Sequence, residues 1–283
     1  MNEQRRRPSE TTRWQWPQVA GIYLIAVGFL VLLDVTLKTG WISLIILPAI
    51  GISFLVGGVR LRRLALLIAG SLVTGLGLGS VIFITRMPQL GWLTGLGVLA
   101  MAFGLGWCLI SVFTHLIFHR VAWWALLTGS IFIGIGLALM ARPVTITGFA
   151  LYLGACLGVA FLAWGVTARL FGLIIPGCLL VTMGPGVYAA WEGVNEPSSL
   201  ARTGIMLVAF ALGWGLITVS SRVITQKFVW WPLIPGGILA MVGWGLYIGG
   251  NPDNALSFIG NTGSIGLIIF GVYLLLLRRG IHS

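Results

Sequence analysis

Charged residues are scarce in this sequence of 283 residues: they make up only 8% of the chain, and only six of them are acidic. A soluble globular domain carries about 25% charged residues, so the composition excludes one. In place of charge, 58% of the residues are hydrophobic and 41 are glycine. We therefore expect an integral membrane protein whose first partner is the lipid bilayer.

Cysteine and histidine are also rare, with three of each. Cys108, Cys156 and Cys178 fall in apolar runs without metal-ligand spacing, which favours small buried residues over ligands. His115 and His119 are four residues apart and share a helical face, but no third ligand follows them. No Ser/His/Asp set, pair of membrane carboxylates or HExxH motif occurs, so we expect no enzyme, no metal and no cofactor.

Long apolar runs follow one another along the chain. A helix needs about 20 apolar residues to cross a hydrocarbon core of about 30 Å, whereas a membrane β-strand alternates in polarity over about 10 residues. The runs here are long and continuously apolar, which predicts an all-α protein. Ten transmembrane helices are predicted, near residues 18–36, 42–59, 64–85, 90–113, 121–140, 145–167, 170–190, 200–219, 229–249 and 258–277.

The net charge of +11 is placed unevenly along these helices. If the first helix runs outward, 13 of the 17 basic residues lie on the inner side and four on the outer side, namely Lys38, Arg86, Arg142 and Arg202. This asymmetry follows the positive-inside rule and predicts a cell-membrane protein with both termini in the cytoplasm. Anionic lipid headgroups account for the basicity, so no nucleic acid is implied.

An ungapped shift of 107 residues aligns two parts of the chain. Residues 102–112 read AFGLGWCLISV and residues 209–219 read AFALGWGLITV, which agree at eight of eleven positions. The shift also places Trp123 and Trp124 on Trp230 and Trp231. Such matches at rare residues predict a parallel duplication of a four-helix unit.

The duplication divides the chain into five segments. These are a cytoplasmic basic tail at 1–16, an N-terminal hairpin at 17–63, repeat A at 64–170, repeat B at 171–277 and a cytoplasmic tail at 278–283. Each odd-numbered helix also carries two glycines seven residues apart, at 21/28, 70/77, 129/136, 177/184 and 236/243. Seven residues make about two helical turns, so each pair forms a stripe at which two helix backbones can approach. We interpret the stripes as packing seams.

Repeat B differs from repeat A in its prolines and acids. Pro176 stands where the first copy has Ala69, and Pro185 where it has Leu78. A proline inside a helix frees a backbone carbonyl, which must be satisfied by protein or by a water-filled cavity. Helix 170–190 is therefore the best candidate for a broken span, although kinked packing without a ligand is the interpretation that we favour. The candidate binding or gating residues are Pro176, Thr182, Gly184, Pro185, Gly186, Glu192 and Glu196.

The segments WWALLTGSIFIGIGLALMARP and FVWWPLIPGGILAMVGWGLY resemble Gly-rich helical hairpins of uncharacterised prokaryotic multi-span membrane proteins. They are also similar to the acid-resistance membrane protein family typified by HdeD. The resemblance covers helices five to ten and implies a stress-related or scaffolding role. Ten short-looped helices also resemble the drug/metabolite transporter superfamily in layout, but that superfamily uses inverted five-helix halves.

Two functions fit these features. The first is a non-enzymatic structural membrane protein that packs with itself as a homo-oligomer, with lipid or with a larger complex. The alternative is a small-molecule carrier or pore with its site in helices seven to ten, which would need a polar site near the membrane midplane. We favour the first, because the sequence offers no membrane-buried charge to couple transport to an ion gradient.

Overall fold

The computed structural model describes residues 15–37, 41–193, 198–225, 229–249, 260 and 263. All regular structure in these ranges is helical, as predicted. The helices are α1 (Gln15–Leu37), α2 (Trp41–Leu61), α3 (Leu64–Leu90), α4 (Trp92–Phe118), α5 (Trp123–Met140), α6 (Ile146–Ala168), α7 (Phe171–Glu192), α8 (Ser199–Thr225) and α9 (Leu233–Gly249). The expected tenth helix at 258–277 falls almost wholly outside the described residues, as do most of both predicted tails.

Seven of the described helices, α2 to α8, are long and apolar enough to cross a membrane. The described apolar stretches of α1 and α9, Leu24–Asp34 and Leu233–Ile248, are shorter. The chain therefore has the character of a multi-pass membrane protein. The prediction of ten spans extends beyond these seven.

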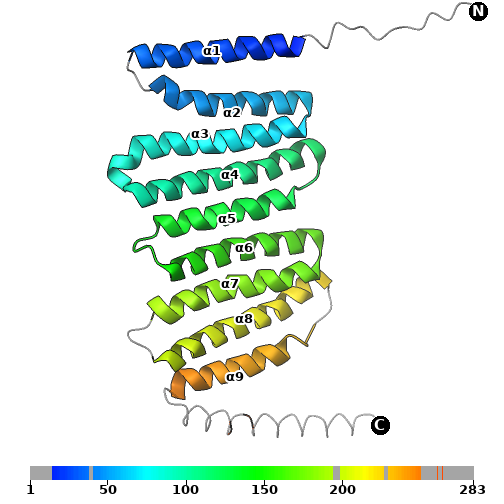
Figure 1. Ribbon diagram of the computed structural model, residues 1–283. Helices are drawn as coiled ribbons and strands as arrows, with labels where there is room; N and C mark the ends of the chain where they lie inside the picture. The colour runs from blue at the N-terminus through cyan, green and yellow to red at the C-terminus, as the bar shows by residue number, and fades with distance from the viewer. Residues whose placement is uncertain are drawn as a thin grey trace, which may run out of the picture.

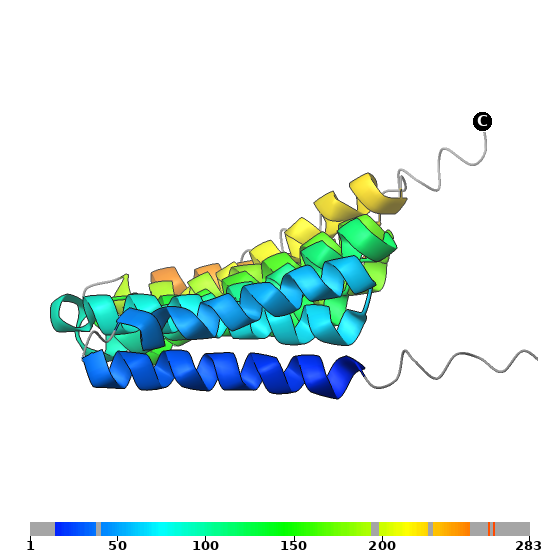
Figure 2. The same ribbon diagram turned by 90° about the horizontal axis from the view of Figure 1, so that it is seen from above.

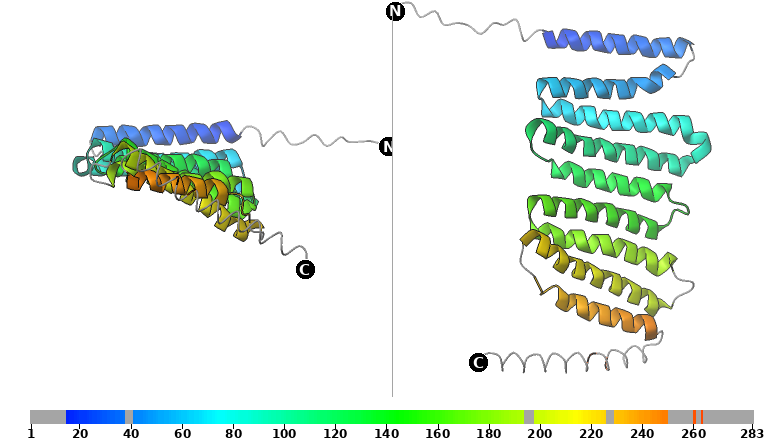
Figure 3. Two further views of the ribbon diagram at one scale, coloured as in Figure 1. Left: turned by 90° about the horizontal axis from the view of Figure 1, so that it is seen from below. Right: turned by 180° about the vertical axis from the view of Figure 1, so that it is seen from behind.

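The helices form a single row in chain order, with each helix antiparallel to the next (Figure 1). Views from above, below and behind show that the row is one helix thick and gently twisted (Figures 2 and 3). Within the described residues, every extensive contact between helices joins chain neighbours, and α1 makes far fewer contacts with α2 than the later neighbours make with each other. The candidate site in helices seven to ten is arranged in the same way, because α8 lies between α7 and α9.

Glycine forms the seams of the row. All four buried residues of α6 are glycines: Gly148, Gly154, Gly158 and Gly165. Large apolar side chains lie on the open faces instead, as do Leu105, Val159 and Leu212, each more than 50% exposed. Since lipid offers no hydrophobic drive for helix association, close contact at small residues is what holds such helices together.

The glycine stripes of the odd helices all face the same way along the row. A Cβ built on any of these glycines in α3, α5, α7 or α9 would lie within 4 Å of the preceding even helix. The contacts join Gly70 and Gly77 to α2, Gly129 and Gly136 to α4, Gly177 and Gly184 to α6, and Gly236 and Gly243 to α8. Gly21 and Gly28 of α1 have no such neighbour within 4 Å, because α1 is the first helix.

Local geometry recurs at positions 107 residues apart. Arg62 and Arg169 end α2 and α6 with left-handed φ angles of 49° and 53°. In each case the next residue donates its N–H to a glycine carbonyl five positions back, at 3.1 Å for Arg63 to Gly58 and 2.9 Å for Leu170 to Gly165. This is the Schellman pattern, which satisfies carbonyls at the end of a helix.

Aromatic contacts recur at the same interval. The rings of Phe103 and Trp107 are 6.2 Å apart at 81°, and those of Phe210 and Trp214 are 6.2 Å apart at 82°. Trp107 also meets Trp124 at 5.5 Å, as Trp214 meets Trp231 at 5.7 Å. The α4–α5 and α8–α9 seams therefore have closely similar side-chain packing.

Candidate functional site

The two prolines of α7 do not break the helix. α7 is one continuous helix over 22 residues, and both Pro176 and Pro185 lie inside it. Each proline removes one backbone hydrogen bond, a loss that membrane helices tolerate when their neighbours hold the segment in place. α7 therefore contains no break at either proline.

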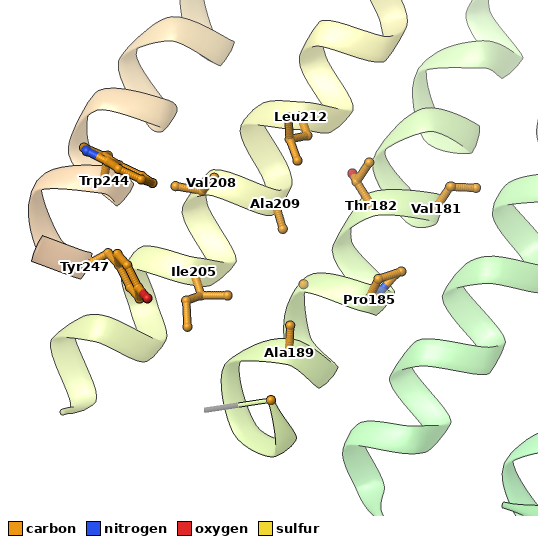
Figure 4. Close-up of a pocket in the computed structure, with 12 residues that line it drawn as sticks. Val181, Thr182, Pro185, Ala189, Ile205, Val208, Ala209, Leu212, Trp244 and Tyr247 are labelled. Carbon is orange, nitrogen blue, oxygen red and sulfur yellow. The ribbon is translucent and has the colours of Figure 1, made fainter. Parts of the chain in front are cut away.

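Three of the predicted site residues, Thr182, Pro185 and Gly186, line one groove. The other walls come from α8, including Ala209, and from α9, including Trp244 (Figure 4). We call this the outer groove, because it lies toward the ends of α7, α8 and α9 that the charge distribution predicts to be outside. Its volume is about 690 Å³, and its surface is largely apolar.

Thr182 contributes little polarity to the outer groove. Its hydroxyl donates to carbonyl oxygens of its own helix, at 3.1 Å to Cys178 and 3.2 Å to Leu179. A Cβ built on Gly213 would lie 2.5 Å from the Thr182 oxygen, so this residue packs on the seam with α8. The arrangement favours an apolar occupant.

Gly184 belongs to a different surface from its neighbours. A Cβ built on this buried glycine would lie 2.6 Å from the carbonyl oxygen of Ala150 in α6. It therefore packs on the α6–α7 seam, on the far side of the helix from α8. Pro176 is half-buried near the N-terminal end of α7 and is not among the residues that line the outer groove.

Glu192 is not among the residues that line the outer groove. Its carboxylate accepts a hydrogen bond of 2.9 Å from the hydroxyl of Thr147 in α6. Thr147 in turn lies beside Thr145, the N-cap of α6, whose side chain accepts from the Gly148 N–H at 3.1 Å. Glu192 thus links the adjacent ends of α6 and α7, and Glu196 lies outside the described residues.

Arg202 is the basic residue nearest to the outer groove along α8. It lies three residues before Ile205, which lines the groove, so the two share a helical face. Its guanidinium carbon lies 5.9 Å from the centre of the Trp191 ring, a cation–π contact. The Arg202 Nε is buried without a hydrogen-bond partner. Arg202 therefore places a positive charge at the outer end of an apolar groove.

The other titratable candidates do not gather into a site. His115 and His119 are both exposed at the end of α4. Among the described residues, no group of three or more His, Cys, Asp or Glu side chains is placed to hold a metal. Asp34 is buried at 3% exposure near the end of α1.

Sequence reasoning missed Arg202 and the aromatic wall of Trp244. A signal for Arg202 and for the open space beside it was present in the 107-residue alignment, which pairs Ile82 with Ala189 and Gly95 with Arg202. A bulky residue replaced by a small one opens space, and a glycine replaced by arginine adds a charge. The site was predicted from prolines and acidic residues, and neither kind of residue is involved in these two differences.

Comparisons with protein-family models, with curated proteins and with solved structures found no significant match.

Proposed function

We propose that this protein is a non-enzymatic, multi-pass cell-membrane protein with a structural role, which forms complexes with further copies of itself. The observation that carries this proposal is the single row, in which extensive contacts join only chain neighbours among the described helices. A row one helix thick encloses no compartment, so it suits a wall or scaffold. Both termini are cytoplasmic in this proposal, and a stress-related role stays a prediction from the HdeD resemblance.

The proposal includes the duplication of a four-helix unit. Its support is the recurrence, at an interval of 107 residues, of the Schellman turns and the aromatic seams. Backbone approach recurs as well: a Cβ on Gly97 would lie 2.7 Å from the Gly136 oxygen, and one on Gly204 would lie 2.5 Å from the Gly243 oxygen. Repeated units joined only to their neighbours are typical of proteins that extend in one direction.

The edge at α1 supports self-association. Its glycine stripe, Gly21 and Gly28, is open, whereas the described equivalents in the other odd helices each meet a preceding helix. Leu24 and Ile25 beside the stripe are 73% and 74% exposed. In this proposal, a helix of a second copy lies against α1 as α4 lies against α5.

Cross-linking tests the contact in native membranes. Leu24→Cys is introduced into a background in which Cys108, Cys156 and Cys178, all free, are replaced by alanine. A short bis-maleimide should yield a covalent dimer. Gly28→Leu should greatly reduce this product, because the added side chain blocks backbone approach.

Gly237→Leu is the matched control, since Gly237 also has no neighbouring atom within 4 Å but lies on α9. It should leave the dimer yield unchanged. Absence of a dimer, or equal yields from the two glycine variants, would show that α1 is not a self-association edge.

The carrier or pore remains the second candidate, because the outer groove brings together Thr182, Pro185 and Gly186. A carrier requires a midplane site with access from both sides. A reconstituted flux assay distinguishes the candidates: specific substrate uptake that is lost in Pro185→Ala with Glu192→Gln, while folding is retained, would replace the structural proposal.

A further inference from the structure

We propose that the outer groove binds one membrane phospholipid of the outer leaflet, with an acyl chain along α8 and the phosphate at Arg202. This inference goes beyond the structural role and does not depend on self-association. Three features carry it: the length and volume of the outer groove, its apolar surface, and the cation at its outer end.

The length of the outer groove matches one leaflet. Its α7 wall extends from Val181 to Gly193, which at 1.5 Å per residue is about 18 Å. Half of a hydrocarbon core of about 30 Å is about 15 Å. An acyl chain that follows this wall would therefore end near the bilayer midplane, at the level of Thr182.

The volume also fits an acyl chain. A chain of about 16 carbons, with each methylene taken as about the size of a water molecule (~30 Å³), needs roughly 480 Å³. The outer groove provides about 690 Å³. Its walls are apolar, with Leu212 and Ala209 from α8 and the Trp244 ring from α9 (Figure 4).

The polar end of a lipid would meet Arg202. This residue lies in the first turn of α8, three positions beyond the groove residue Ile205 toward the outer side. The cation–π contact with Trp191 holds the guanidinium in place, so its positive charge lies at the outer end of the groove. A phosphate accepts charge-assisted hydrogen bonds from arginine, so the charges are complementary.

Repeat A provides an internal comparison. At the positions equivalent to Ala189 and Val208 it has the larger Ile82 and Met101. At the position of Arg202 it has Gly95, where a Cβ would lie 2.7 Å from the ring of Phe83. Repeat A therefore has larger side chains at these two groove positions and lacks the arginine. Repeat B has smaller side chains there, next to Arg202.

Native mass spectrometry of the full chain in detergent tests this inference, with dioleoyl phosphatidylglycerol and dioleoyl phosphatidylcholine as probes. The wild type should bind one phosphatidylglycerol more tightly than any further lipid. Arg202→Gln should weaken this first binding about tenfold, as expected when a charged hydrogen bond is lost. Arg86→Gln is the matched control, because Arg86 is also predicted on the outer side but lies on α3, away from the outer groove, and it should change nothing.

A second variant tests the apolar walls. Ala189→Ile with Val208→Met installs the residues of repeat A and should remove the tight binding of phosphatidylglycerol while thermal unfolding stays cooperative. Unchanged binding in this variant and in Arg202→Gln would overturn the inference. Several weak lipids of equal affinity in the wild type would overturn it too, since they would indicate a general lipid annulus.

Discussion

At the scale of single residues, the row depends on glycines whose backbones touch. A Cβ on Gly97 would lie 2.7 Å from the Gly136 carbonyl oxygen, a backbone atom that cannot move aside without shifting a helix. Interiors resist added volume because close-packed groups have no free space nearby. Adding even one methyl group at these seams should therefore destabilise the protein.

The first prediction concerns Gly97→Ala and Gly204→Ala. Each should destabilise the protein by about 1–3 kcal/mol, the usual cost of overpacking. Gly237→Ala, at a glycine with no atom within 4 Å, should be neutral or slightly stabilising because alanine is the better helix former. Unfolding in mixed micelles with increasing dodecyl sulfate measures the three variants. Equal effects at all three sites would show that the seams are not closely packed.

The sequence predicted the residue types at the seams better than it predicted the site. The spacing of Gly129 and Gly136 indicates a stripe, and the structure places that stripe against α4. A glycine stripe alone does not predict which helix packs against it, because any helix surface with small residues can do so. Arg202 was counted only as an outer charge, because its place beside the groove depends on how α7 and α8 pack.

At the scale of elements, the apolar runs fixed the helix positions closely. The predicted segment 145–167 corresponds to α6 at Ile146–Ala168, and 170–190 corresponds to α7 at Phe171–Glu192. Length and hydropathy suffice here because backbone groups in lipid must be bonded within a helix. They do not show whether a proline breaks the helix, which depends on the neighbours.

The second prediction concerns Pro185 in α7, which is exposed in the outer groove. Pro185→Ala restores an N–H that can bond to the Val181 carbonyl, four residues earlier. Proline is less favourable than alanine in a helix by about 3 kcal/mol, so this variant should unfold at a higher temperature than the wild type. Scanning fluorimetry in detergent measures the shift. A lower unfolding temperature would show that the seams need the backbone shape that proline imposes.

The third prediction concerns the direction of the helices. Because consecutive helices are antiparallel (Figure 1), the turn after α4 and the turn after α5 lie on opposite sides. The positive-inside rule places Arg120 inside and Pro143 outside. Alkaline phosphatase fused after Pro143 should be active, and green fluorescent protein fused after Arg120 should fluoresce. The reverse pattern of signals would invert the topology.

At the scale of the whole molecule, the arrangement is a wall rather than a bundle. Large apolar side chains such as Phe29, Leu105 and Leu212 are exposed on the row, as expected for surfaces that face lipid or another copy. The sequence predicted a membrane protein and a repeat but not a row. Each helix is apolar on all sides, so its sequence pattern does not predict whether a given face contacts lipid or a second layer of helices.

The distance between Leu76 of α3 and Met183 of α7 tests the row most directly. These exposed residues are separated by four helix steps along the row, which at 8–10 Å each is roughly 32–40 Å. Spin labels at both positions, in a variant without native cysteines and diluted with unlabelled protein in nanodiscs, allow measurement by double electron–electron resonance. The account predicts a distance distribution centred in that range. A distribution centred near 20 Å, about two helix diameters, would show a closed bundle and contradict it.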